Sequence, residues 1–187
     1  MIEICTSQNA TDLLTNSINR ITERLENHLP EEIPIVVSDL NNINALFPSS
    51  AIPNEFQFYS RILRNGFGIT QPKNFIGGVR KHLIVLNTEF ITRLKLSESE
   101  LDAVIAHELG HILNEPNRDI PNFSEEQEYY ADFFASLIGL KEPLLSSMTK
   151  YLEQENAQNS ELFNLRIRNL TEENEFGNGN IRKLQNE

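Results

Sequence analysis

The chain has 187 residues, of which 39% are hydrophobic and 23% are charged, as in an ordinary globular domain with one buried core. Its 27 acidic residues outnumber its 16 basic ones, and the net charge of −11 argues against a nucleic-acid partner. The single cysteine, Cys5, excludes an intrachain disulfide and a thiolate-rich metal site. The first residues lack the features of a secretory signal, and no apolar run is as long as a membrane span. We therefore expect a cytoplasmic protein without membrane insertion.

The first half of the sequence predicts a mixture of helices and strands. Apolar residues at three- and four-residue spacing indicate an amphipathic helix over residues 11–29, which Pro30 closes. The short β-branched run at residues 33–37 predicts a strand, whereas residues 41–47 fit no single pattern. Further along we expect a helix at residues 55–63, a loop or hairpin at 66–78, a strand at 79–86 and a short helix or turn at 87–96.

The next predicted helix carries the clearest chemical signature in the chain. Ser97 and Glu100 form a capping-box pattern, which predicts that a helix begins here and runs to about Leu113. Within this helix His107 and His111 are one turn apart and lie on the same side, so both imidazoles can reach one divalent cation. Their spacing is that of the H-E-x-x-H motif of zinc peptidases.

Two further features of this helix fit a catalytic metal site. Glu108 lies inside the motif, beside the water that the metal would hold, and is the candidate general base. Ala103, Ala106 and Gly110 form a strip of small residues along which another backbone can approach closely. A helix that served only for packing would have no use for two neighbouring histidines beside a glutamate.

A third metal ligand must come from outside this helix. A catalytic zinc ion usually has three protein ligands and leaves one position for water. No histidine follows His111, so a carboxylate must complete the set. The candidates are Glu115, Asp119, Glu125, Glu126, Glu128 and Asp132.

Helix geometry favours Glu128 as the third ligand. A second capping-box pattern at residues 124–127 predicts the start of another helix, on which Glu128 and Asp132 share a face with alanine and glycine residues. Such a face can pack closely against the small-residue strip of the first helix. Glu125 and Glu126 are interpreted instead as an acidic first turn stabilised by the helix dipole. Asp132 would then hold one of the imidazoles through the ring nitrogen that does not bind the metal.

Together the two helices resemble the HExxH…ExxxD pattern of gluzincin metallopeptidases. The first part of the pattern is His107-Glu108-Leu109-Gly110-His111, and the second is Glu128-Tyr129-Tyr130-Ala131-Asp132. Residues 87–111 are similar to the corresponding part of the M48 (Ste24/HtpX-like) family, and the resemblance covers residues 79–140.

Members of family M48 are commonly embedded in membranes. The short connection between the two motifs and the lack of a span look more like the compact ImmA/IrrE-type peptidases, which usually carry Asn in place of Asp132. Both resemblances imply the same site. One Zn²⁺ ion is bound by His107, His111 and Glu128, and Glu108 acts as the base.

The function implied is that of a zinc metalloendopeptidase acting on a peptide or protein substrate. Glu108 would take a proton from the metal's water and pass it to the leaving amine. We expect the strand at residues 79–86 to pair with an extended substrate, while Tyr129, Tyr130 and His82 are open possibilities for stabilising the oxyanion. The alternative is a regulatory or partner-binding module that keeps the zinc fold without catalysis, and an intact Glu108 argues against it.

These patterns predict an α+β fold. We expect a minimal zincin-like metallopeptidase domain, with an active-site helix, a small mixed sheet and a following helix that carries the third ligand. Residues 1–170 would form this single domain. Residues 171–187, rich in Glu, Asn, Gly and Gln, are expected to form a mobile polar tail. Nothing in the sequence indicates an oligomeric state.

Overall fold

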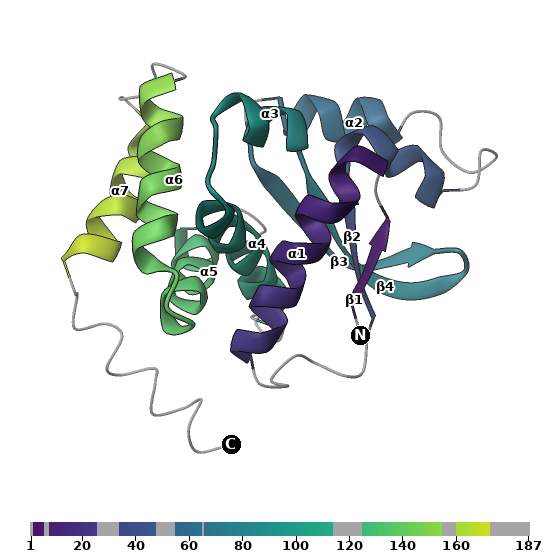
Figure 1. Ribbon diagram of the computed structural model, residues 1–187, viewed down its shortest axis with the longest axis horizontal. Coiled ribbons are helices and arrows are strands. Elements are labelled where there is room, and N and C mark those ends of the chain that lie inside the picture. The colour runs from purple at the N-terminus through teal and green to yellow at the C-terminus, as the bar shows by residue number, and fades with distance from the viewer. Residues whose placement is uncertain are drawn as a thin grey trace.

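A four-stranded mixed sheet lies at the centre of the computed structural model, which describes residues 2–5, 8–25, 34–47, 55–64, 66–113, 125–154 and 160–172. Helices pack around this sheet, so the expected α+β fold is confirmed (Figure 1). The strands are arranged in the order β1-β2-β4-β3. The first three in this order are parallel and the last is antiparallel at one edge: β1 (Ile2–Cys5), β2 (Ile35–Asp39), β4 (Val79–Leu86) and β3 (Gly68–Ile76).

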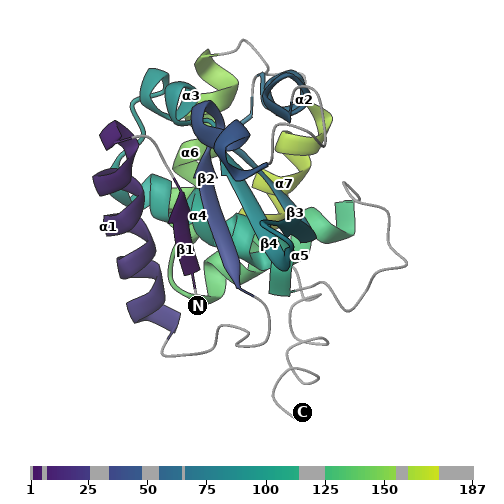
Figure 2. The same cartoon turned by 90° about the vertical axis from the view of Figure 1, so that its right-hand side faces the viewer.

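Helices make up most of the described residues, and they alternate with the strands in the first half of the chain. Figures 1 and 2 show α1 and α4 beside the sheet, with α5, α6 and α7 on the side of α4 away from α1. The helices are α1 (Gln8–Leu25), the 3₁₀ helix η1 (Leu40–Leu46), α2 (Glu55–Ile62), α3 (Thr88–Arg93), α4 (Glu98–Leu113), α5 (Glu125–Leu137), α6 (Lys141–Gln154) and α7 (Glu161–Thr171).

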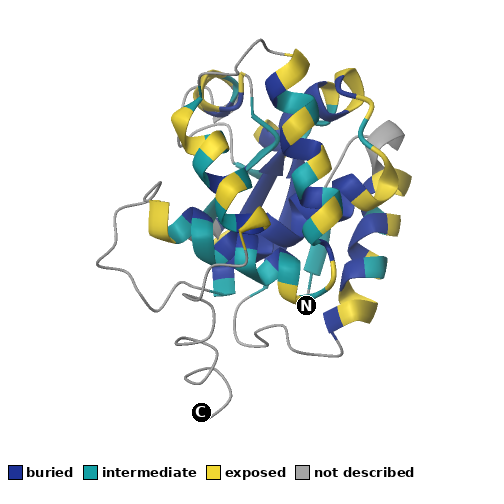
Figure 3. Ribbon diagram, turned by 90° about the vertical axis from the view of Figure 1, so that its left-hand side faces the viewer, coloured by how far each residue is buried: buried dark blue, intermediate teal, exposed yellow. Residues whose placement is uncertain are grey.

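Two apolar layers enclose the sheet because its side chains alternate between its faces. In β4, Ile84 and Leu86 pack with α1 and α4, whereas Leu83 and Val85 pack with η1 and α2. The buried residues accordingly gather on the strands and on the inner faces of the helices (Figure 3). The sheet therefore supports α4 on one face and is covered by η1 and α2 on the other.

Helix α4 begins where the capping box predicted. The backbone N–H of Ser97 donates to Glu100 Oε2 at 2.6 Å, and the backbone N–H of Glu100 donates to Ser97 Oγ at 3.3 Å. Leu101, Ile105 and Leu109 face the sheet, as their spacing requires. This orientation leaves the two motif histidines to face α5.

The other predicted elements differ from the structure mainly at their ends. The helix expected at residues 11–29 begins earlier, at Gln8, and is described as far as Leu25, while β2 is displaced by two residues from the expected strand. The expected strand at 79–86 and the helices at 55–63 and 87–96 are confirmed as β4, α2 and α3. Helix α5 begins at Glu125, where the second capping pattern predicted a helix, although Ser124 of that pattern lies outside the described residues. The expected tail at 171–187 lies outside them from residue 173 onward.

The segment 66–78, expected as a loop or hairpin, contains the whole of strand β3 and the turn of the hairpin that β3 forms with β4. Strand β3 pairs with β4, and the turn between them contains Gly77 and Gly78 at φ angles of 59° and 77°. These left-handed angles suit a tight hairpin turn and favour glycine. Strand β1 gave no signal in the sequence, because four residues are too few to show a pattern.

Strand β4 cannot serve as the strand that receives a substrate, so that prediction is wrong. It lies between β2 and β3, and both neighbours take up its backbone hydrogen-bonding groups over most of its length. Strand β3 forms the edge of the sheet on that side. None of the described helices is both long and apolar enough to cross a membrane.

Candidate metal centre

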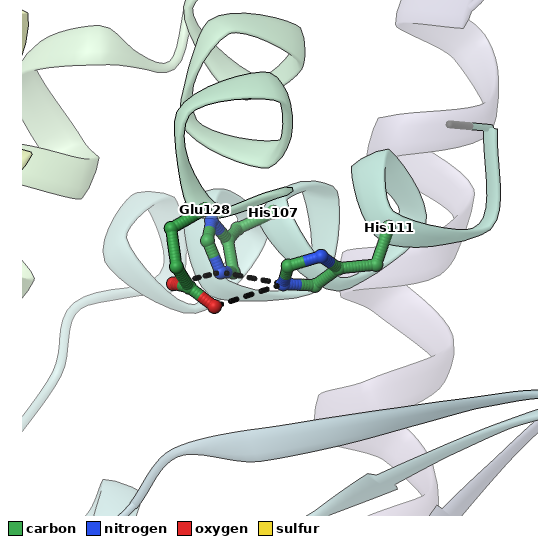
Figure 4. A group of neighbouring side chains, drawn as sticks. All are labelled: His107, His111 and Glu128. Carbon is green, nitrogen blue, oxygen red and sulfur yellow. Dashed lines mark hydrogen bonds and ion pairs between the residues drawn. The ribbon is translucent and has the colours of Figure 1, made fainter. Parts of the chain in front are cut away.

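Three side chains predicted as metal ligands converge on one point. Figure 4 shows the imidazoles of His107 and His111, both from α4, directed toward the carboxylate of Glu128 on α5. The two Nε2 atoms are 3.2 Å apart. Glu128 Oε2 lies 3.4 Å from His107 Nε2, and Glu128 Oε1 lies 3.5 Å from His111 Nε2.

These distances fit a tetrahedral metal ion. Ligand atoms about 2.0–2.2 Å from a metal at the centre of a tetrahedron are roughly 3.3–3.6 Å from one another. The two imidazole nitrogens, 3.2 Å apart, agree with this spacing, and each lies 3.4–3.5 Å from a different oxygen of Glu128. With one donor atom taken from each residue, all three atoms lie within 4.8 Å of one another. Two imidazoles and one carboxylate could hold a divalent ion and leave its fourth position for water.

The ligands come together because α4 and α5 pack without a side chain between them. A Cβ atom added at Gly110 would lie 2.7 Å from Ala131 Cα and 3.1 Å from Ala131 O, both backbone atoms. Gly110 precedes His111 in α4, and Ala131 is one turn beyond Glu128 in α5. The predicted small-residue strip thus does bring the second helix close enough for its carboxylate to reach the histidines.

Asp132 and Arg166 form a charged layer behind the ligands. Asp132 Oδ1 is 2.8 Å from His107 Nδ1, the ring nitrogen that faces away from the other ligands, as predicted for Asp132. Arg166 of α7 donates through Nε and Nη2 to both oxygens of Asp132, at 2.9 and 2.6 Å. Its Nη1 lies 2.9 Å from Glu128 Oε2. One guanidinium therefore orients two carboxylates and compensates part of their charge.

The two histidines differ sharply in their affinity for protons. Burial and the Arg166 charge oppose protonation of His107, but hydrogen bonds with Asp132 and Glu128 outweigh them and raise its pKa to about 9. Burial and the neighbouring charge on His107 lower the pKa of His111 to about 3. Burial would raise the pKa of Glu128, yet contact with His107 and the Arg166 charge lower it to about 2. Without a metal, the pocket thus holds a proton on His107 between two carboxylates.

Glu108 is buried beside the ligands and is held by the edge strand. Only 5% of the residue is exposed, and the hydroxyl of Thr70 in β3 donates to Glu108 Oε2 at 2.8 Å. Burial raises the pKa of Glu108, against the lowering influence of His107 and Thr70. A carboxylate that takes up a proton more readily than usual is suited to act as a general base.

The remaining candidates from the sequence lie elsewhere or outside the described residues. Glu125 and Glu126 are exposed in the first turn of α5, in agreement with their interpretation as dipole-stabilising residues. Glu115 and Asp119 lie outside the described residues. The rings of Tyr129 and Tyr130 contact each other edge to face, and His82 lies in β4 opposite Ile35 of β2. A role of Tyr129, Tyr130 or His82 in stabilising the oxyanion stays a prediction.

A comparison with known families supports the resemblance seen in the sequence. Residues 34–119 match the model of Peptidase family M48. This part of the chain is similar to family M48. The match covers a little under half of the chain, from the start of β2 past the end of α4, so it includes both motif histidines and ends before Glu128. Neither a curated protein nor a solved structure gives a match. The M48 match supports a metallopeptidase.

Sequence reasoning missed two residues that contact this site, Arg166 and Thr70. Both act across long separations in the chain, which no local pattern records. Arg166 does leave a signal, because it shares one face of α7 with Phe163, Ile167 and Leu170. An arginine on an apolar helix face needs a buried anion, and the acidic pair on α5 supplies one. Thr70 leaves no comparable signal.

Proposed function

We propose that the chain is a zinc-dependent metalloendopeptidase in which His107, His111 and Glu128 bind the metal. The observation that carries this proposal is the convergence of one donor atom from each of the three residues, all within 4.8 Å of one another. The donor set of two imidazoles and one carboxylate suits zinc well. When bound, a zinc ion would supply a water of lowered pKa and polarise the carbonyl of the scissile peptide bond.

Glu108 would move the proton in this reaction. Its buried carboxylate lies next to His107 in the chain, and the raised pKa favours transfer of a proton from water to the carboxylate. The same proton then passes to the amine that leaves. Asp132 and Arg166 would hold His107 and Glu128 in place through the contacts described above.

Edge strand β3 is the element best situated to align an extended substrate. Its outer side has no neighbouring strand among those described, and Thr70 in this strand contacts Glu108 directly. Addition of a peptide as a further strand would bring its backbone beside the base. This assignment replaces β4, whose two sides are occupied.

Substitution of Glu108 tests the proposed mechanism. The Glu108→Gln variant should bind one zinc ion per chain and lose at least about 100-fold in the rate of cleavage of an unfolded casein-like protein. Glu125→Gln is the matched control, because Glu125 is exposed in α5 and should leave the rate unchanged. Metal content and cleavage are measured with and without a chelator. A zinc-loaded wild-type chain that cleaves nothing would contradict the proposal in favour of a regulatory module, and a fully active Glu108→Gln variant would contradict the role of Glu108.

A further inference from the structure

The hydroxyl of Thr70 makes two contacts with a single residue of α4. Its Oγ1 lies 2.8 Å from Glu108 Oε2 and 3.0 Å from the backbone oxygen of Glu108. A hydroxyl has one hydrogen, which these two acceptors must share. The contact therefore ties the side chain of Glu108 to its own backbone through a residue that is 38 positions away in the sequence.

The pleat of β3 directs this hydroxyl toward α4. Thr70 pairs with Ile84 and Gly68 with Leu86, two residues of β4 that face α4. The intervening Ile69 packs on the opposite face of the sheet. Gly68 and Thr70 thus form the part of the edge strand that lies against Glu108.

Gly68 limits the space around the other oxygen of Glu108. A Cβ atom at Gly68 would lie 3.0 Å from Glu108 Oε1 and 2.8 Å from Leu86 Cδ2. Any larger residue would press on the carboxylate. With Oε2 held by Thr70 and Oε1 beside a residue without a side chain, the carboxylate has one preferred orientation.

We propose that Thr70 is a positioning residue, which holds the Glu108 carboxylate in the orientation needed for proton transfer. This inference rests on the proposed peptidase function. Glu108 is almost fully buried, so few water molecules could replace the hydroxyl if it were removed. The carboxylate would then turn toward other partners, and misplacement of a catalytic group by about 1 Å can cost roughly 100-fold in rate.

Two substitutions at Thr70 separate this role from a packing role. Thr70→Val keeps the shape of the side chain and removes the hydroxyl, whereas Thr70→Ser keeps the hydroxyl. We expect Thr70→Val to retain one zinc ion per chain and a KM within about twofold of wild type, with kcat reduced about 10- to 100-fold. Thr70→Ser should have a kcat within about threefold of the wild-type value. A wild-type kcat in Thr70→Val, or an equally slow Thr70→Ser, would overturn the inference.

Thr88→Val is the matched control for loss of a hydroxyl. Thr88 Oγ1 donates to the carboxylate of Asp39 at 2.6 Å, so this variant loses the same kind of bond at a place that does not contact Glu108. It should keep the wild-type kcat. A fall in kcat equal to that of Thr70→Val would show that any lost hydroxyl slows the enzyme, and would overturn the inference.

A second measurement does not depend on peptidase activity. Unfolding by urea is followed for the metal-free full-length chain carrying Thr70→Val, Glu108→Ala or both. If the hydroxyl holds the carboxylate, Thr70→Val lowers the urea midpoint much less in the Glu108→Ala background than in wild type. Equal losses in both backgrounds would overturn the inference. A zinc-loaded wild type without activity would refute the proposed function, while this cycle would still test the contact itself.

Discussion

Replacement of Gly110 by alanine should weaken the metal centre, although alanine is the better helix former. Gly110 lies in α4, three residues before its end at Leu113, and exchange of glycine for alanine inside a helix ordinarily stabilises it by about 1 kcal/mol. The opposing effect comes from α5. The new Cβ atom would lie 2.7 Å from Ala131 Cα and 3.1 Å from Phe134 Cβ.

The size of the displacement follows from these distances. Carbon atoms in contact are normally about 3.5–4.0 Å apart, so the two helices would have to separate by about 1 Å. Overpacking of this kind costs about 1–3 kcal/mol, which offsets or exceeds the gain in helix propensity. Because the helices carry the two histidines and Glu128, the same movement would take the carboxylate beyond metal-binding distance. We expect zinc affinity to fall at least about tenfold.

Two measurements test this prediction on Gly110→Ala. Urea unfolding of the metal-free chain gives stability, and competition with a chromophoric chelator gives zinc affinity. Gly66→Ala is the control, since a Cβ atom at Gly66 would lie an ordinary 3.5 Å from Leu63 Cδ2. A Gly110→Ala chain that is about 1 kcal/mol more stable than wild type and binds zinc normally would refute the packing argument.

Two further predictions concern protons. The pKa of His107 is about 9 in the metal-free chain, so zinc must displace a proton from this imidazole at neutral pH. Calorimetry at pH 7.5 in buffers of different ionisation enthalpy should record about one proton released per zinc, and a value near zero would disagree with the assigned ligand. At Glu100, burial would raise the pKa, but hydrogen bonds from Lys150, Ser146 and Ser97 outweigh it and lower the pKa to about 2. A folded-state pKa below the unfolded value adds stability that is complete above about pH 5 and is lost as pH falls toward 2. Glu100→Gln should therefore cost about 2 kcal/mol at pH 7, allowing for screening at Lys150, and almost nothing at pH 2. An equal cost at both pH values, measured by urea unfolding, would refute this account.

The sequence predicted those parts of the site that depend on local periodicity. The spacing of His107 and His111 sets their direction on α4, and the capping box defines where that helix starts. Glu128 and Asp132 could be selected because helical periodicity aligns them with residues small enough to contact α4. These relations extend over one or two turns, where helix geometry alone decides which side chains share a face.

Relations across the sheet and between distant helices could not be predicted in the same way. The order of strands depends on which edges meet in space, so the sequence of β4 could not show that β3 covers one of its sides. The contacts of Arg166 with α5 and of Thr70 with α4 depend on the packing of whole elements. Such contacts are set by the tertiary fold. The apolar face around Arg166 indicates only that a buried anion is needed, and no local pattern names the partner of Arg166 or Thr70.

Arg166 lies in α7, the last described helix, so it is synthesised after all the other residues of the site. Both metal-binding motifs leave the ribosome well before this guanidinium, which pairs with Glu128 and Asp132 together, as His107 also does. A growing polypeptide that ends ahead of α7 would have to bury two carboxylates with His107 as their shared cationic partner and without the guanidinium, which makes this burial less favourable. We therefore expect nascent chains without α7 to form the metal centre less stably than the full chain. Synthesis of α7 would then supply the last partner that the two buried carboxylates have among the described residues.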